Sequence, residues 1–305
     1  MAKNKLIKDF IEEQINHLRD EQRFGTANNY EKTMRSFMNF IGNRPLTIKN
    51  MSKQLISEYN LYLVKRGLMR NSISFYMRNM RATYNKAAKQ KIVKREELFT
   101  EVYTGIDKTR KRAVDENVIK KMYKLKLEQG SVLAFARDIF IFSYCMRGMS
   151  FVDIAYLRKS DIDGKVVRYC RRKTGQLLSV KIEESMRTII NSYNDESSIY
   201  VFPIIRSEDK GESYKQYRSA INIYNRLLKE LSDRIGISDG LSSYTARHSW
   251  ATEARRHNIP ISVISAGMGH SSELITQIYL KSIEDDVVDN ANAEIIGELT
   301  IDKEE

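Results

Sequence analysis

The chain has 305 residues, about twice the length of a typical single domain, which favours two domains. Hydrophobic residues make up 42% of it and charged residues 30%, values that argue against disorder, collagen-like structure and coiled coil. Because no run of about eighteen apolar residues occurs and the charged start MAKNKLIKDF lacks an apolar stretch, neither a membrane-spanning helix nor a signal peptide is expected.

The net charge of +12 is unevenly distributed along the chain. Residues 1–110 contain 22 Lys and Arg against 11 Asp and Glu, residues 111–280 contain 27 against 19, and residues 281–305 contain 2 against 9. A basic body with an acidic tail suggests a polyanionic partner, for which nucleic acid is the obvious candidate. Charge alone also fits a surface that is merely solvated, so it does not decide the function.

The first hundred residues are predicted to form a bundle of four short helices. Apolar residues recur at three- and four-residue steps within 6–18, 30–41, 55–63 and 73–84. A helix of such a bundle can lie in the major groove of DNA. We therefore predict DNA contacts from the basic residues at and along the fourth helix, which are Arg70, Arg78, Arg81 and Lys86.

Periodicity fades between residues 99 and 112, which predicts a domain boundary. We interpret residues 101–112 as a linker whose basic run, Arg110, Lys111 and Arg112, follows a phosphate backbone; a solvated loop is the alternative. Two alternating segments, 166–172 and 176–182, flank Thr174-Gly175 and predict one β-hairpin. The fold class is thus mainly α with a small antiparallel β-sheet, and the other helices are expected over 115–126, 132–146, 183–191, 214–235, 244–257, 261–266 and 274–282.

Several kinds of chemistry lack their sequence motifs. The chain has no Gly-rich phosphate loop, no Gly-x-Gly-x-x-Gly and no Gly-x-Ser-x-Gly. Its four histidines have no His or Cys neighbours at ligand spacing, and no dense carboxylate cluster occurs, so no metal site is predicted. Cys145 and Cys170 are interpreted as packed thiols of a reducing, intracellular compartment. We expect an enzyme, if it is one, to work with no cofactor.

Cationic residues in unusual local patterns remain. Arg147 ends an apolar helix, where it could simply neutralise the helix C-terminus, and Lys173 precedes the hairpin turn, where lysine is common for solubility. Tyr244 and Arg247 lie three residues apart on a predicted helix and should share a face. His270 stands in Gly-His-Ser-Ser and is followed nine residues later by Tyr279.

In this order and spacing, Arg147, Lys173, Tyr244 with Arg247, His270 and Tyr279 resemble the signature of the tyrosine recombinase (phage integrase) family. The resemblance covers essentially the whole chain. It implies a helical core-binding (SAM-like) domain over 1–100, a tyrosine-recombinase catalytic domain over 113–282 and an acidic C-terminal tail helix over 283–305. The sequence of residues 147–157 is also similar to that of a narrower group, the integrases of Bacteroides-type mobile elements.

The resemblance implies a site-specific recombinase that cleaves and rejoins DNA strands through a 3′-phosphotyrosyl intermediate, integrating or excising a mobile element. Its implied partners are double-stranded DNA at recombination sites, further copies of the chain that form a tetramer in the synapse, and accessory DNA-bending proteins. The implied location is the bacterial cytoplasm, at the nucleoid. A relaxing topoisomerase and a catalytically silent DNA-binding protein on the same fold are the alternatives.

The resemblance also implies roles for single residues. Tyr279 would be the nucleophile, and Arg147 and Arg247 would bind the non-bridging phosphate oxygens bidentately. Lys173 would be the general acid for the departing 5′ oxygen. His270 would hydrogen-bond the phosphate or take the proton of Tyr279, and both roles stay open. Asp153 would be a supporting residue that orients Arg147. The catalytic residues implied are thus Arg147, Lys173, Tyr244, Arg247, His270 and Tyr279.

Two features depart from a simple match. Tyr244 occupies the position where the family usually has histidine, and its phenol can donate a hydrogen bond but does not titrate near neutrality. Nine residues of straight helix span roughly 13 Å, so His270 and Tyr279 cannot reach one phosphate along a rigid rod. We therefore expect Ser271 or Ser272 to cap a new helix, and the Tyr279 segment to move when DNA or a neighbour binds.

The amphipathic tail would pack on its own domain or be exchanged between protomers.

Overall fold

The computed structural model describes residues 5–107, 113–280, 292 and 296. The chain divides into two compact units, Met1–Thr109 and Arg110–Glu305, and each is described by itself. The prediction of a mainly α fold with a small antiparallel sheet is confirmed. Within the described ranges, no helix has both the length and the apolar character needed to cross a membrane.

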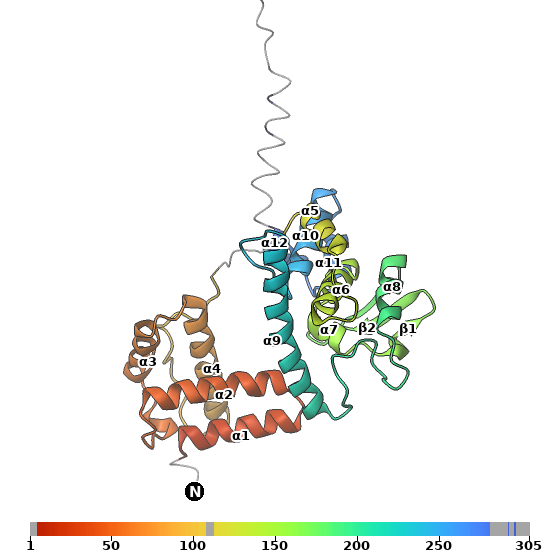
Figure 1. Cartoon of the computed structure of the whole chain (residues 1–305). Coiled ribbons are helices and arrows are strands. Elements are labelled where there is room, and N and C mark those ends of the chain that lie inside the picture. The colour runs from red at the N-terminus through yellow and green to blue at the C-terminus, as the bar shows by residue number, and fades with distance from the viewer. Residues whose placement is uncertain (1–4, 108–112, 281–291, 293–295, 297–305) are drawn as a thin grey trace, which may run out of the picture. The chain divides into compact units, whose positions relative to one another are not determined.

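The first unit is a helical bundle. Its elements are α1 (Ile7–Asp20), α2 (Phe24–Phe40), the 3-10 helix η1 (Ile48–Asn50), α3 (Lys53–Lys65) and α4 (Arg70–Lys89). Helices α1 and α2 lie side by side (Figure 1). In its core the rings of Phe37 and Tyr59 meet edge to face at 5.1 Å, and the Tyr59 hydroxyl donates to the buried Ser36 Oγ at 2.9 Å. The three- and four-residue periodicity thus corresponds to the buried faces of real helices.

The second unit combines helices with one sheet. Its elements are α5 (Glu116–Lys124), α6 (Val132–Cys145), α7 (Phe151–Ala155), η2 (Lys159–Asp161), β1 (Ile162–Asp163), β2 (Val166–Cys170), β3 (Leu177–Lys181), α8 (Glu184–Ser192), α9 (Lys210–Arg234), α10 (Thr245–Arg256), α11 (Ile261–Met268) and α12 (Glu273–Leu280). Strands β1, β2 and β3 form an antiparallel sheet in that order. Val167 faces Val180 and Tyr169 faces Leu178, all four on the buried side.

Three details differ from the expectations. The sheet has a third strand, β1, and α7 was not predicted, because two and five residues are too short to show a periodic pattern. Helix α9 begins at Lys210, four residues before the predicted start. The reason is the side chain of Asp209, which accepts the Glu212 amide at 2.8 Å and thereby caps the helix.

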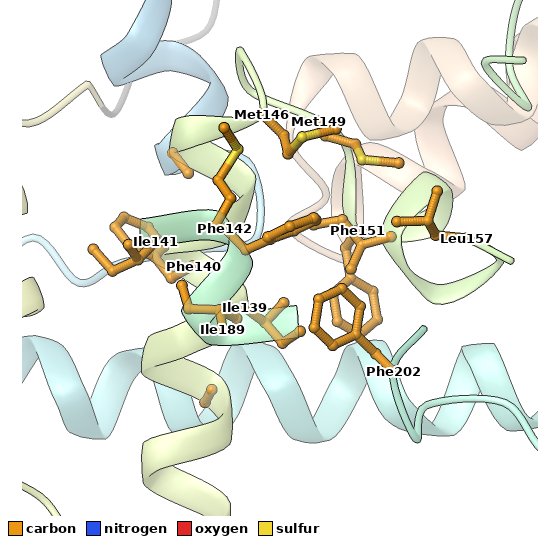
Figure 2. Packing of buried hydrophobic residues seen from close by; sticks show 14 of the residues in the cluster. Ile139, Phe140, Ile141, Phe142, Met146, Met149, Phe151, Leu157, Ile189 and Phe202 are labelled. Carbon is orange, nitrogen blue, oxygen red and sulfur yellow. The ribbon is translucent and has the colours of Figure 1, made fainter. Parts of the chain in front are cut away.

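Helix α6 is the centre of the second unit. Ile139, Phe140, Ile141 and Phe142 follow one another on it and are all buried, so the helix is enclosed on every side (Figure 2). It packs against α5, α8, α9 and α10, and the Phe142 ring meets that of Phe202 edge to face at 4.9 Å. The end of α6, where Arg147 lies, is therefore held in place by the core.

A smaller apolar cluster joins the last helices. Ala251 from α10, Ile264 and Met268 from α11, and Leu280 from α12 are buried against one another. This cluster packs α10, α11 and α12 against one another.

Candidate active site

Arg247 is the hub of the site. Its side chain is only 2% exposed, although it carries a charge. Its Nη1 donates to the carbonyl oxygen of Gly148 at 2.7 Å, and its Nη2 donates to that of Met268 at 2.7 Å. Nη2 also lies 3.0 Å from His270 Nε2. One guanidinium on α10 thus connects the turn after α6, the end of α11 and the segment between α11 and α12.

The turn after α6 has a backbone that few residues adopt. Arg147 has a φ of +57° and Gly148 a φ of +72°, both in the left-handed region. A Cβ on Gly148 would lie 2.7 Å from the Cα of Arg247, so only glycine allows this approach. The Arg147 side chain runs beside α11, since a Cβ on Gly267 would lie 3.6 Å from its Cδ. The structure therefore brings Arg147 and Arg247 to the same end of α11.

His270 lies between Arg247 and α12. Its Nδ1 is 2.8 Å from Thr276 Oγ1, and its Nε2 faces Arg247. Because a guanidinium only donates, Nε2 must accept, so the ring proton is on Nδ1 and is donated to Thr276. Burial, followed by the positive charges of Arg247, Arg171 and Lys173, lowers the pKa of His270 to about 4. His270 is therefore neutral at pH 7.

Lys173 lies at the exposed tip between β2 and β3, as predicted for a hairpin turn. Its charge is among those that lower the pKa of His270, so the tip faces the same site. The buried Asp153 holds this tip: its Oδ1 accepts the Arg172 amide at 2.9 Å, and its Oδ2 accepts the Ser150 hydroxyl at 2.6 Å. The described hydrogen bonds of Asp153 thus support the hairpin; orientation of an arginine by Asp153 stays a prediction.

Arg171 is a site residue that the sequence did not reveal. It is 4% exposed, and its Nη1 donates to the carbonyl oxygen of Gly269. It lies within the alternating segment 166–172, and no role was predicted for it. The alternation of buried Val167 and Tyr169 on β2 continues to position 171, and this period of two is the signal that could have identified it.

Tyr244 is placed differently from Arg247. It is the residue before α10, it is 37% exposed, and its ring lies 5.4 Å from that of His248. Tyr244 is thus partly exposed just before the first residue of α10, whereas Arg247 is buried within the helix, and their common face stays a prediction. The backbone of Tyr279 belongs to α12, whose buried residues Thr276 and Leu280 fix the helix, but its side chain lies outside the described residues.

The predicted DNA-contacting residues of α4 differ in their surroundings. Arg70 stacks on the Tyr103 ring at 3.8 Å and Arg81 donates to Thr104 Oγ1 at 3.0 Å, and both are exposed. Arg78 is half-buried. Lys86 lies over the Tyr30 ring at 4.8 Å, and its pKa is lowered by burial and by the nearby charge of Arg23.

Some predicted features lie outside the described residues. They are the basic run Arg110, Lys111 and Arg112 and nearly all of the acidic tail over 283–305. Among the residues that the structure does describe, no three or more His, Cys, Asp or Glu are grouped so that they could hold a metal ion.

Comparison with known proteins identifies the family and the fold. Residues 6–104 match the phage integrase SAM-like domain, and residues 112–285 match the phage integrase family. The fold is similar to that of a lambda integrase fragment, solved as a dimer bound to a COC′ core site, with a TM-score of 0.66 at 12% identity over 89% of this chain and 94% of that one. The Tn1549 transposon integrase in complex with a circular intermediate DNA gives 0.63 at 15% identity over 90% and 95%.

A lambda integrase tetramer bound to a Holliday junction gives a TM-score of 0.65 at 11% identity over 90% of this chain and 77% of that one. At such identities these likenesses concern the fold alone. None of the curated proteins matches the chain significantly.

Proposed function

The chain belongs to the phage integrase family of tyrosine recombinases, and from this premise we propose that the cluster around Arg247 is the active site with which it breaks and rejoins DNA strands. The observation that carries the proposal is the chain of contacts from Arg247 through His270 to Thr276 on α12. It links a buried phosphate-binding group to the helix whose backbone includes Tyr279, three residues beyond Thr276.

In the proposed reaction Tyr279 Oη attacks a phosphorus atom of the DNA backbone. The proton of Tyr279 passes to water, the Oη–P bond forms, the bond from phosphorus to the 5′ oxygen breaks, and Lys173 donates the proton that this oxygen takes up. The resulting 3′-phosphotyrosyl ester conserves the bond energy. The 5′ hydroxyl of another strand then attacks the ester and gives its proton back to Lys173, a new phosphodiester forms as the Oη–P bond breaks, and Tyr279 regains a proton from water.

Arg147 and Arg247 stabilise the negative charge that grows on the non-bridging oxygens. Guanidinium groups suit this task because they bind two oxygens in a fixed geometry. Removal of one such donor typically costs about 2.7–4 kcal/mol of transition-state stabilisation. The two main-chain carbonyls that hold Arg247 preorganise it before DNA arrives.

For His270 the geometry favours hydrogen bonding over base catalysis. Its Nε2 lone pair accepts from Arg247, and its Nδ1 proton goes to Thr276. The imidazole would have to leave Arg247 before it could take a proton from Tyr279. We therefore assign His270 the role of holding Arg247; to contact a bound phosphate, its Nδ1–H would first have to leave Thr276.

Duplex DNA at recombination sites is the proposed substrate, and α4 with Arg70, Arg78 and Arg81 is its proposed contact in the first unit. We further propose a tetramer in the synapse, help from DNA-bending proteins and a role in moving a mobile element within the cytoplasm. The supporting observations are the basic body of the chain and the DNA held by the lambda and Tn1549 integrases of similar fold.

A nicked suicide substrate, which loses the fragment carrying the 5′ hydroxyl after cleavage, tests the proposal. We expect a covalent protein–DNA adduct that resists denaturing gel electrophoresis and that disappears in Tyr279→Phe. Tyr123→Phe serves as the comparison, because it removes one hydroxyl from an exposed ring on α5 and should retain the adduct. If the unmodified protein binds the DNA and forms no adduct, the silent DNA-binding protein is the better description.

A further inference from the structure

Arg171 is a buried cation, and a contribution to stability does not by itself explain why it is there. It is 4% exposed, its Nε lies buried without a hydrogen-bond partner, and no carboxylate of the described residues pairs with it. Burying a charge in this way is costly. The contacts that the structure gives its side chain and its backbone lie within the protein, and they show what the residue holds together.

The residue is attached to two parts of the site at once. Its amide donates to Gln176 O at 2.8 Å and its carbonyl oxygen accepts from the Gly175 amide at 2.7 Å, so its backbone closes the turn that carries Lys173. Its side chain donates to the carbonyl oxygen of Gly269, the residue before His270. A single residue thus connects the hairpin tip with the segment between α11 and α12.

This connection leaves little free space. Gly269 has a φ of +63°, and a Cβ placed there would lie 2.7 Å from Arg171 Cδ and 3.0 Å from Leu178 Cδ1. The arginine stem therefore packs directly on the backbone beside His270. Its charge also contributes to the lowered pKa of His270.

We propose that Arg171 is a positioning residue that fixes Lys173 relative to His270, so that the general acid and the phosphate-binding group act on the same phosphodiester. The inference rests on the function proposed above for Lys173 and His270. If Arg171 is removed, Lys173 should be misplaced, and the defect should be confined to protonation of the leaving group. Displacement of a reacting group by about 1 Å can cost about 100-fold in rate.

The test compares Arg171→Met with Arg172→Met. Both remove one positive charge from the same tip, but Arg172 stacks on the Tyr156 ring at 3.7 Å and its side chain is exposed. Each variant is given two suicide substrates, one with the ordinary 5′ oxygen and one with sulfur at that position. Sulfur leaves as a thiolate and needs no proton, so cleavage of the second substrate does not depend on Lys173.

For Arg171→Met we expect cleavage of the oxygen substrate from the bound complex to fall about 100-fold and the sulfur substrate to restore most of the rate. Arg172→Met should show no such difference between the substrates. Arg171→Lys, which keeps a donor for Gly269, should lie between Arg171→Met and the unmodified protein. Equal defects of Arg171→Met on both substrates would overturn the proposal, because Lys173 would then not be what is misplaced.

A second measurement is independent of activity. Hydrogen exchange followed by NMR should become faster at the amides of both Gly175 and His270 in Arg171→Met, and at neither in Arg172→Met. If the unmodified protein forms no adduct with either substrate, the proposed function fails, and this measurement still decides the role of Arg171. Unchanged exchange at both amides in Arg171→Met would refute it.

Discussion

Single hydrogen bonds fix the chemical form of the site. Arg247 can only donate, so His270 must accept at Nε2 and donate at Nδ1. Thr276 is the acceptor that completes this arrangement, and it is fully buried. The tautomer of one histidine therefore depends on a hydroxyl six residues further along the chain.

Thr276→Val tests this dependence. The change keeps the shape of the side chain but leaves the Nδ1 proton without its acceptor, so we expect a loss of about 1–3 kcal/mol in the free energy of unfolding. Urea denaturation measures the loss, and ¹⁵N shifts of His270 report the tautomer. Thr188→Val is the matched control, since Thr188 is exposed on α8 and bonds only its own helix at Glu184. Equal losses in the two variants would contradict the importance of Thr276.

The lowered pKa of His270 gives a pH dependence with a definite sign. The folded protein favours neutral His270 because its pKa falls from 6.5 to about 4, so the folded state binds fewer protons than the unfolded state between these values. This contribution to stability is complete above pH 6.5 and is lost as the pH falls toward 4. In urea denaturation at pH 7.5 and 5.0, His270→Gln should lose less stability on acidification than the unmodified protein. An equal loss would show that His270 is not the responsible group.

At the scale of elements, the site depends on how closely the end of α6 approaches α10. Gly148 permits this approach because it has no Cβ and adopts a positive φ. As a result, the Gly148 Cα packs on the Arg247 backbone, and the Gly148 carbonyl oxygen accepts a hydrogen bond from the Arg247 side chain.

Gly148→Ala should destabilise the protein more than Gly164→Ala. Both glycines have a positive φ, which costs an alanine about 1–2 kcal/mol, but a Cβ at Gly164 meets nothing within 4 Å. At Gly148 the added Cβ meets backbone atoms of Arg247, so we expect the total loss to exceed that of the control and the cleavage rate to fall as well. Urea denaturation and the suicide substrate measure the two effects. Similar unfolding energies for both variants would argue against the close approach.

Much of this arrangement could be predicted from the sequence, and the remainder has physical reasons. The apolar segment 132–146 predicts α6 and the amphipathic segment 71–91 predicts α4, and the order of Arg147, Arg247 and His270 indicated the family now shown by the match over 112–285. The roles of the separate site residues stay predictions. The alternation on β2 could have indicated that Arg171 is buried, but not that its side chain meets Gly269, 98 residues away in sequence. The burial of Thr276 and its contact with His270 could not be predicted, because no local pattern reveals them.

For the whole molecule, the positive charge should contribute a salt-dependent and largely sequence-independent share of DNA affinity. Not every basic residue contributes equally. Arg81 is exposed, whereas Lys86 packs over Tyr30 and has a lowered pKa. Their exposure therefore separates Arg81, which is able to meet phosphate, from Lys86, which is partly withdrawn from solvent.

Arg81→Gln should weaken binding to all DNA sequences and reduce the slope of log affinity against log salt by about 1. Lys86→Gln should change the slope less, since its ammonium is already partly withdrawn from solvent. Fluorescence anisotropy with labelled duplex over a range of salt concentrations measures both slopes. Equal reductions in the two variants would contradict the distinction drawn from their surroundings.

The cations around His270 have one more consequence. After burial, the charges of Arg247, Arg171 and Lys173 each lower the pKa of this imidazole, so three like charges lie near it. Repulsion among like charges opposes folding of the unbound protein, and an anion bound among them would relieve it. Anything that binds only the native state raises its resistance to heat in proportion to the logarithm of its concentration. The DNA that carries the recombination site is therefore also a stabilising ligand. The protein should unfold at a higher temperature when it is bound to this DNA than when it is free.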